Sequence, residues 1–453
     1  MSRRTSTRPH AVSSPSFYST DLRQAIRQFL PRSGLALVVN DDKLRWVPRM
    51  LVSCAILMTW DLAGMISDAF ERARGVLLKM YCSRRRPGES YGGFMATLAH
   101  QTAKHLALLV PTLRGHVRAL AESCDCWRVD GWCAFGVDGS RIECPMSVAN
   151  EAAFGTAGRK KTGPQQFLTT LFHVASGLIW DFRRGAARAS ERAHLLEMLD
   201  DLPPEAMLLA DAGFTGYEFL QKVMHSGRSL LVRVGSNVQL LLKLGWCCEE
   251  QEGIVYLWPD KARKREQAPL VLRLITLVDG RNRRIDLLSN VLDQSRLSDA
   301  AALQLYRKRW GVELIYRSLK QTMGKRKLRC DAPANAAVEL QWSVIGLWLL
   351  GLMSVSRIVE GGASPGSWSV AYSLRVVRRV MAGILAQGSQ CRPSLKRSLA
   401  LAVKDQYLRH GSKEARHWPH KKKEKPPGQP RARMALESEI KLAAELRERR
   451  PAA

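Results

Sequence analysis

Three carboxylates in the sequence stand where regular elements could bring them together. Asp138 directly follows the apolar run Cys133–Val137. Asp211 follows Met207–Ala210 in the same way, and each run predicts a short strand. Glu313 lies in a stretch with helical periodicity. An acid at the end of a strand is often only a turn former, but three carboxylates together are the hard oxygen ligands that Mg²⁺ prefers. Two such ions could serve the attacking and the leaving oxygen of an in-line phosphoryl displacement.

The helix expected over residues 298–320 presents a polar face around Glu313. The face holds a phenol, two cations and the carboxylate, at Tyr306, Arg309, Lys320 and Glu313. Their offsets from the tyrosine are 0, 3, 14 and 7, so at about 100° per residue all four project within roughly 60°. A plain alternative is a solvated face, on which Arg309 and Glu313 form an exposed i,i+4 pair of about 0.3–0.5 kcal/mol. Beside bound metal ions, the same cations and phenol would hold DNA phosphates.

In this order, the residues are similar to the signature of an enzyme family. The spacing Tyr306-x2-Arg309-x3-Glu313-x6-Lys320 resembles the YREK signature of bacterial DDE transposases of the insertion-sequence-four type. Three further segments resemble the first-aspartate block, the second-aspartate block and the strand before the catalytic helix of that family, and these are Val137–Ser140, Ala210–Phe214 and Leu287–Val291. The similarity extends over about residues 130–360.

The resemblance implies an α/β fold with an RNase H-like catalytic core. In such a core a mixed sheet is flanked by helices, and here a β-rich insertion would separate the second aspartate from the glutamate. The resemblance also assigns catalysis and metal binding to three residues, Asp138, Asp211 and Glu313, and DNA binding to three others, Tyr306, Arg309 and Lys320. The implied cofactor is Mg²⁺, with two ions bound, for which Mn²⁺ could substitute.

The implied activity is cut-and-paste transposition of an insertion sequence. Metal-dependent hydrolysis would nick double-stranded DNA at the terminal inverted repeats, and strand transfer would join the freed end to target DNA. The implied assembly is a homodimer in the synaptic complex. One departure from the family is Ala212, where many members carry arginine, and it puts a phosphate contact in question rather than the metal site.

The charge of the chain agrees with a polyanionic partner. The 453 residues include 70 Lys+Arg against 41 Asp+Glu, a net charge of +29, which favours nucleic acid or an anionic membrane face. The uncharged stretch Leu340–Ser356 has only 17 residues, includes several polar ones, and therefore predicts a buried helix rather than a membrane span. No secretory signal is evident in Met1–Pro31, and ten cysteines in a chain of this length indicate reduced thiols. We expect a cytoplasmic, nucleoid-associated bacterial protein with no membrane partner.

The elements that must position the acids divide the chain into six regions. We expect a disordered N-terminus (1–20), a helical DNA-binding region (21–128), a first core part (129–235), a β-rich insertion (236–295), a second core part with the catalytic helix (296–385) and a basic tail (386–453). Within the first core part the predicted order is three strands, a helix, a strand, a helix and a strand. The tail is expected to be a basic linker over His410–Arg433 followed by a charged helix over Ala435–Arg449.

Other residue groups are weaker candidates. The cysteines at 124, 126, 133 and 144 match no common zinc spacing, and Gly155–Gly163 lacks the order of a phosphate-binding loop. His173 is predicted to be structural. The basic residues Lys160, Lys161, Arg183, Arg184 and Arg188 could contact the DNA backbone or form a solvated rim. Trp246 and Trp258 could each stack on a flipped base, although a core role is the more common one.

Two other functions remain open at this level. One is an RNase H-fold nuclease that only hydrolyses DNA, which strand-transfer products would exclude. The other is a DNA-binding relative that has lost catalysis, against which the complete set of acids and the YREK series argue.

Overall fold

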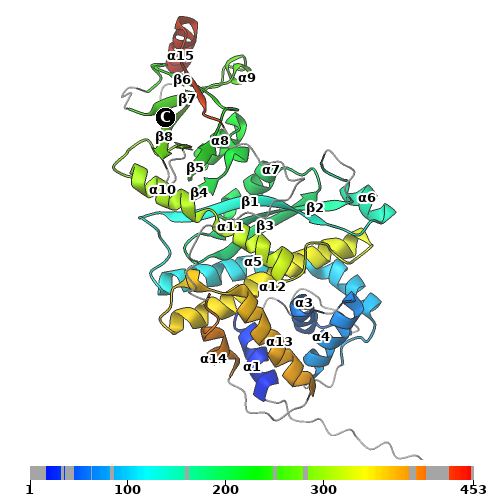
Figure 1. Cartoon of the computed structure of the whole chain (residues 1–453). Coiled ribbons are helices and arrows are strands. Elements are labelled where there is room, and N and C mark those ends of the chain that lie inside the picture. Colours follow the sequence, from blue (N-terminus) through cyan, green and yellow to red (C-terminus); the bar gives the residue numbers. More distant parts are fainter. Residues whose placement is uncertain are drawn as a thin grey trace, which may run out of the picture. The chain divides into compact units, whose positions relative to one another are not determined.

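The computed structural model describes residues 17–31, 35, 45–62, 64–81, 86–158, 163–247, 252–278, 284–386, 394–404 and 428–449. The chain divides into two compact units. The first comprises residues 1–120, 142–165 and 317–404, and the second comprises 121–141, 166–316 and 405–453. Helices dominate the first unit, whereas the second is built on a sheet (Figure 1). Lys160 and Lys161 lie outside the described residues, as do Lys421–Lys423 and most of residues 1–20.

Within the described ranges, one mixed sheet of ten strands underlies the second unit, in the order β10-β6-β7-β8-β9-β5-β4-β1-β2-β3. The strands are β1 Cys133–Glu143, β2 Gln165–His173, β3 Leu178–Ala186, β4 Ala206–Ala210, β5 Ser229–Val234, β6 Gln239–Leu242, β7 Ile254–Leu257, β8 Leu270–Val278, β9 Arg284–Ser289 and β10 Arg431–Met434. β4 lies parallel to both β1 and β5, whereas β2 and β3 form an antiparallel hairpin. The predicted α/β fold, a mixed sheet with flanking helices, is confirmed.

The apolar runs of the sequence explain which strands are central. All nine residues of β2 and all five of β4 are buried, as expected of strands that are covered on both faces. The hairpin between β2 and β3 turns at Gly177, whose φ of +67° suits glycine. Two helices of this unit, α7 (Glu191–Met198) and α8 (Tyr217–His225), connect the strands as the periodicity predicts.

The strands from residues 236–295 extend the core sheet. β9 pairs antiparallel with β5, from Leu231↔Ser289 to Val234↔Asp286, and β8, β7 and β6 follow outward. The β-rich segment therefore continues the hydrogen-bonding ladder of the strands β1, β4 and β5. Its tryptophan Trp258 is only 3% exposed and donates its indole N–H to the carbonyl of Gln267 at 2.7 Å. Trp258 is thus a core residue, which is the role that the sequence favours over stacking on a base.

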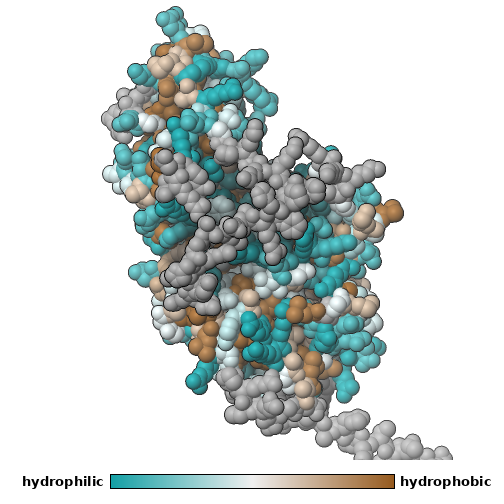
Figure 2. Space-filling model, in the orientation of Figure 1, coloured by the Kyte–Doolittle hydropathy of each residue, from teal (hydrophilic) through white to brown (hydrophobic). Residues whose placement is uncertain are grey.

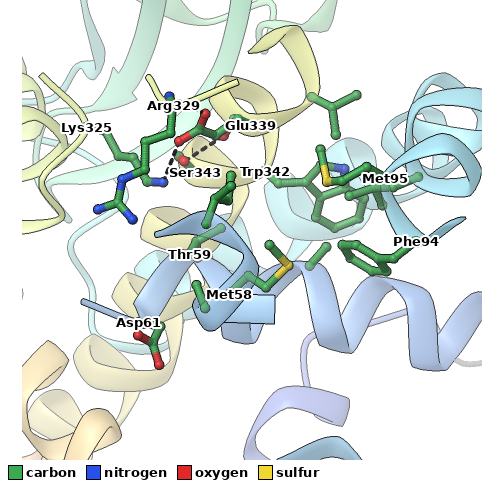
Figure 3. A pocket seen from close by; sticks show the side chains of 15 residues that line it. Met58, Thr59, Asp61, Phe94, Met95, Lys325, Arg329, Glu339, Trp342 and Ser343 are labelled. Atoms are coloured by element: carbon green, nitrogen blue, oxygen red, sulfur yellow. Dashed lines mark hydrogen bonds and ion pairs between the residues drawn. The ribbon is translucent and has the colours of Figure 1, made fainter. Parts of the chain in front are cut away.

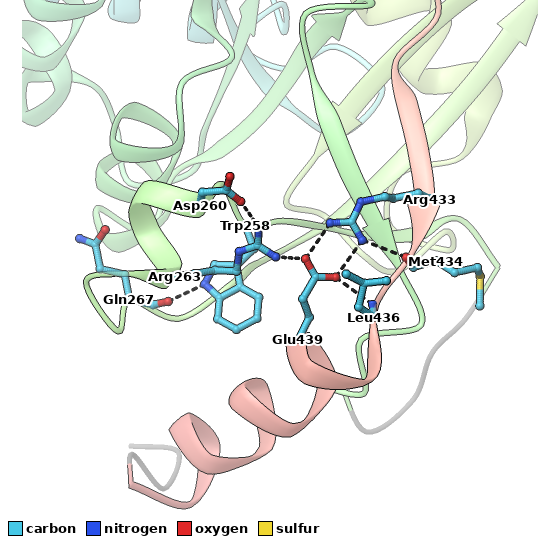
Figure 4. Close-up of polar contacts among 8 residues, drawn as sticks. All are labelled: Trp258, Asp260, Arg263, Gln267, Arg433, Met434, Leu436 and Glu439. Carbon is cyan, nitrogen blue, oxygen red and sulfur yellow. Dashed lines mark hydrogen bonds and ion pairs between the residues drawn. The ribbon is translucent and has the colours of Figure 1, made fainter.

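The C-terminal segment is part of this unit. The linker predicted to run through Arg433 is wrong in its last residues, because Arg431–Met434 form β10, which lies parallel to β6. Helix α15 (Glu437–Arg449) follows, close to its predicted bounds. Its Glu439 is 4% exposed and pairs with Arg263 and with Arg433, the latter at 2.7 Å (Figure 4). A buried carboxylate between two guanidiniums explains why this charged segment folds against the sheet.

Among the residues that the structure describes, eight α-helices and the loops between them make up most of the first unit. They are α1 Phe17–Arg27, α3 Pro48–Trp60, α4 Ile66–Met80, α5 Tyr91–Ser123, α6 Val148–Phe154, α12 Pro333–Glu360, α13 Val370–Ala386 and α14 Leu395–Ala400. Among the described residues, α12 is the one helix long and apolar enough to cross a membrane, and 89% of its apolar window is buried within the protein. The prediction of a buried helix over Leu340–Ser356 is therefore confirmed.

A buried ion pair fixes the segment before α12. Lys325 and Glu339, both 7% exposed, are joined at 2.9 Å. Glu339, drawn in Figure 3 with Lys325 and Arg329, also accepts a hydrogen bond from the backbone N–H of Arg329 at 2.8 Å. The backbone N–H of Cys330 donates to the same carboxylate at 3.3 Å. The adjoining cavity of about 30 Å³ has room for about one water molecule. This ionic cluster gives Glu339, which lies in the first third of α12, a structural role.

The positive charge of the chain lies outside the core. Among the described residues, the buried cations are Arg273, Arg309 and Lys325. Hydrophilic residues cover much of the face drawn in Figure 2, with apolar residues scattered among them. A surplus of cations at the surface is the distribution that attracts a polyanion.

Candidate active site

Asp138 and Asp211 are neighbours across two parallel strands. The pairing of β1 with β4 runs from Cys133↔Ala206 to Gly136↔Leu209. The same register continued by two residues sets Asp138 opposite Asp211, and adjacent strands lie about 4.8 Å apart. Burial, followed by the negative charge of Asp211, raises the pKa of Asp138 to about 6. The two carboxylates therefore share one electrostatic environment.

The backbone holds one oxygen of each aspartate. The N–H of Gly139 donates to Oδ1 of Asp138 at 2.9 Å, and the N–H of Gly213 donates to Oδ1 of Asp211 at 2.8 Å. Asp211 follows β4 directly, as predicted for a strand-end acid. Asp138 does not end its strand: the prediction of a strand over Cys133–Val137 is too short, because β1 continues through half-exposed polar positions to Glu143.

Glu313 lies just after a break in the expected helix. The single helix predicted over residues 298–320 is wrong. Instead α10 (Asp299–Lys308) and α11 (Gly311–Arg317) are separated by a tight turn, and a π-helical turn, Ser318–Thr322, follows. At the break the N–H of Arg309 bonds to the carbonyl of Tyr306 at 3.1 Å, and that of Glu313 to Trp310 at 3.2 Å, both three residues back. The 60° arc calculated for a regular helix therefore does not apply.

A buried ring explains how α11 can come close to the sheet. A Cβ on Gly311 would stand 2.6 Å from Cε2 of Phe172, and a Cβ on Gly136 would stand 2.0 Å from Cε1 of the same ring. Phe172 is therefore held between two glycines, one in β1 and one at the start of α11. The close approach brings Glu313 near β1, where its negative charge contributes to the raised pKa of Asp138.

A second residue, not foreseen from the sequence, ties α11 to the sheet. The hydroxyl of Tyr316 lies 2.8 Å from the carbonyl oxygen of Asp138, 2.9 Å from that of Leu168 and 3.2 Å from Oγ1 of Thr170. Tyr316 is buried and its pKa is raised well above its usual value, chiefly by that burial. The signal for it in the sequence is a phenol beside the apolar stripe of this helix, three residues after Glu313.

Tyr306 and Arg309 are buried, not solvated. They are 5% and 8% exposed, and the guanidinium carbon of Arg309 lies 5.5 Å from the centre of the Tyr306 ring. The Tyr306 hydroxyl and the Arg309 Nε have no hydrogen-bond partner within the described part of the chain. Glu313 is exposed, and its pKa is raised by partial burial although Arg309 acts to lower it. Because Arg309 is buried, the alternative of a solvated face with an exposed Arg309–Glu313 pair is wrong.

Lys320 lies in the π-helical turn, Ser318–Thr322, and belongs to the first unit. The structure brings together Asp138, Asp211, Tyr306 and Arg309, with Glu313 nearby, in the second unit. A role for Lys320 beside them stays a prediction.

Sequence reasoning missed a fourth carboxylate, that of Glu191 at the start of α7. Its pKa is raised to about 7, first by burial and then by the charges of Asp211 and Asp138. Its Oε2 lies 2.7 Å from the position of a Cβ on Gly139, and its Oε1 lies 2.7 Å from that on Gly213. The available signal was an acid next to a serine helix cap, which usually indicates only a stabilised helix start.

The carboxylate oxygens of this site are chemically suited to bind a divalent cation. Carboxylate oxygens are the ligands that Mg²⁺ prefers. Burial, and then neighbouring negative charge, raises the pKa values of Asp138 and Glu191 despite the arginines that act to lower them. Within the described ranges, no three His, Cys, Asp or Glu side chains are placed to hold a metal ion together. Mutual repulsion of unneutralised carboxylates is a physical reason for that spread.

The remaining candidates have structural roles. His173 is fully buried, with Nε2 at 3.1 Å from the carbonyl of Trp127 and Nδ1 at 3.0 Å from the hydroxyl of Ser176, so the prediction that it is structural is confirmed. The sulfurs of Cys124 and Cys126 are 2.9 Å apart, whereas Cys133 lies within β1.

The chain is similar to known transposases. Residues 134–349 match the family model of the transposase DDE domain. The chain is 25% identical over 312 residues to the transposase InsG of insertion sequence element IS4 from Escherichia coli (strain K12), covering 65% of this chain and 69% of that protein. A solved structure of the piggyBac transposase, in a synaptic complex with hairpin DNA, superposes with a TM-score of 0.38 at 10% identity, covering 89% of this chain and 78% of that one. A TM-score this low supports no further comparison.

Proposed function

Since this chain belongs to the DDE transposases of the IS4 type, which cleave DNA and transfer its strands, we propose that Asp138, Asp211 and Glu313 are its catalytic acids. The observation that supports this assignment most directly is the register of β1 and β4. It sets the two aspartates opposite each other, and both Asp211 and Glu313 contribute to the raised pKa of Asp138.

The enzyme depends on a divalent metal, as its family does. We assign Mg²⁺, with two ions bound by Asp138, Asp211 and Glu313, and Mn²⁺ as a substitute. Bound ions of this kind activate the attacking oxygen and stabilise the leaving one. The chain's own residues orient the site: backbone N–H groups of Gly139 and Gly213 fix one oxygen of each aspartate. The other oxygen of each aspartate would then be available to hold an ion.

DNA phosphates would bind beside the acids. Tyr306 and Arg309 offer a hydroxyl and a guanidinium N–H that are buried and unpaired among the described residues. A donor in that state is costly unless a ligand accepts from it, and a phosphate oxygen is such an acceptor. Lys320 would add a third contact. Residues 21–128 and the basic tail, 386–453, are proposed to bind the terminal inverted repeats.

In this function the enzyme performs cut-and-paste transposition of an insertion sequence. Hydrolysis frees a 3′-hydroxyl at the terminal inverted repeat, and that hydroxyl then attacks target DNA at the same acids. Two ends must be held at once, so the synaptic complex contains a homodimer. The activity belongs in the bacterial cytoplasm at the nucleoid, with no membrane partner.

The test uses isosteric variants of the three acids. Asp138→Asn, Asp211→Asn and Glu313→Gln should each abolish Mg²⁺-dependent nicking of end DNA, because they keep shape but remove a metal ligand. Binding to end DNA, measured by gel shift, should remain close to wild type, because affinity comes mainly from cations. The exposed Asp200→Asn serves as the matched control and should nick normally.

Wild-type nicking by any one of the three variants would remove that residue from the catalytic set. A labelled, pre-cut end separates transposition from plain hydrolysis, since only a transposase joins it to target DNA. Nicking without joined products would favour the hydrolytic nuclease instead.

A further inference from the structure

The carboxylate of Glu191 reaches both segments that carry the aspartates. Its Oε2 lies 2.7 Å from where a Cβ on Gly139 would stand, and its Oε1 lies 2.7 Å from the matching point on Gly213. Gly139 follows Asp138 directly, and Gly213 comes two residues after Asp211. Only glycine leaves room for the carboxylate at these two positions, so Glu191 lies over the ends of both acidic segments at once.

The geometry also limits the distance between Glu191 and Asp211. The point where a Cβ on Gly213 would stand is 2.7 Å from Oε1 of Glu191 and 2.9 Å from Oδ1 of Asp211. The two oxygens are therefore less than about 6 Å apart. Two oxygen ligands of one Mg²⁺ ion, each at about 2.1 Å from it, are separated by about 3–4 Å. A small side-chain rotation is enough to close that difference.

Glu191 has no cation of its own. Within the described part of the chain it forms no ion pair, and the two arginines whose charge reaches it are bound to backbone. Nε of Arg192 donates to the carbonyl of Gly213 at 2.5 Å, and Nε of Arg141 donates to that of Ala187 at 3.1 Å. Three carboxylates, those of Glu191, Asp138 and Asp211, thus gather with no direct ion pair among the described residues, although arginine charge reaches Glu191 and Asp138 through space.

A second, independent observation indicates that a ligand belongs here. Tyr306 is 5% exposed, and its hydroxyl has no partner in the described structure. It lies close enough to Asp211 for that charge to act on it. An unpaired donor next to unneutralised acids fits a ligand that presents cation and phosphate together.

We propose that Glu191 is a fourth carboxylate ligand of the catalytic centre and binds a divalent cation together with Asp138 and Asp211 before DNA is engaged. The proposal rests on the function proposed above, because it adds an oxygen donor to the same site. The structural alternative is that Glu191 only stabilises the start of α7, as an acid in a first helical turn does.

The test measures cation binding by the full chain without DNA. Metal-free protein is titrated with Mn²⁺ and followed by electron paramagnetic resonance, for wild type, Glu191→Gln, Asp211→Asn and Glu151→Gln. Glu151 is the matched control, an exposed acid in the first turn of α6 behind a serine cap. We expect Glu191→Gln to weaken Mn²⁺ binding by tenfold or more, Asp211→Asn to do the same, and Glu151→Gln to leave it unchanged.

Nicking of end DNA across a Mg²⁺ series gives the second readout. A lost ligand shifts the Mg²⁺ requirement of Glu191→Gln upward by tenfold or more, whereas a weakened helix start leaves that requirement unchanged. Wild-type Mn²⁺ affinity in Glu191→Gln, with affinity lost in Asp211→Asn, would overturn the proposal for Glu191 and leave the proposed function standing. Wild-type affinity in both variants would overturn the metal site itself.

Discussion

The contact of Phe172 with two glycines leads to an unusual prediction for Gly311→Ala. Replacing glycine by alanine within a helix normally stabilises it by up to about 1 kcal/mol. Here the new methyl would stand 2.6 Å from Cε2 of Phe172. The ring has little room to move away, because its opposite edge already fills the space that a Cβ on Gly136 would occupy. Overpacking of this kind costs about 1–3 kcal/mol.

The net effect should therefore be a loss of about 1–2 kcal/mol, which lowers the melting temperature by roughly 2–8 °C. Nicking should fall as well, because Glu313 is two residues further along α11. The matched control is Gly115→Ala in α5, where nothing lies within 4 Å of the new Cβ. That variant should be more stable than wild type by up to about 1 kcal/mol, and its melting temperature should therefore be higher.

A double-mutant cycle identifies the cause. In a Phe172→Leu background the ring edge is gone, so Gly311→Ala should cost at least 1 kcal/mol less than it does beside phenylalanine. Urea unfolding of the four proteins gives the coupling energy. An equal cost in both backgrounds, or a stabilised Gly311→Ala, would refute the reasoning that this ring sets the distance of α11 from the sheet.

Three further predictions follow from buried polar groups. Tyr316→Phe removes the hydroxyl that serves the Asp138 carbonyl, so we expect a loss of about 1–3 kcal/mol and slower nicking, and an unchanged melting curve would contradict this. The pKa of Asp138 is raised to about 6, so the fold disfavours the charged form of this carboxyl. Metal-free protein should therefore lose stability as the pH rises from 4 through 6. A series of melting curves should show a smaller loss for Asp138→Asn. Glu439→Gln leaves the partly exposed Arg263 and Arg433 facing each other and weakens their hydrogen bonds, so it should cost about 1–3 kcal/mol and expose the C-terminal segment to protease. Resistance equal to wild type would show that this ion pair is dispensable.

Local patterns in the sequence predict most elements of the core. The apolar runs that precede Asp211 and form β5, β8 and β9 lie within a few residues of the observed strands. The acids are recognisable because each stands next to such a run or in a periodic helix. What these patterns lack is register: only the pairing of Cys133 with Ala206 reveals that Asp138 and Asp211 are opposite each other.

The break in the catalytic helix was hidden for a related reason. Apolar residues at helical spacing continue through Leu305, Val312 and Leu319, so periodicity alone predicts one helix. The interruption comes from tertiary packing, because Gly311 must pass close to Phe172, a residue about 140 positions earlier. A lone glycine within a helical pattern is compatible with either outcome until its neighbour is known.

Glu191 is the clearest case of a site residue that its own surroundings in the sequence conceal. Beside Ser190 it has the pattern of a helix start, and that structural role is real, since Ser190 accepts a hydrogen bond from Ala193. Its second role depends on space left elsewhere, at Gly139 and Gly213. Each of those glycines suggests only a turn when taken alone. Together they leave room for one carboxylate to lie over both aspartate segments. The position of Glu191 in the site therefore depends on the absence of side chains at these two glycines.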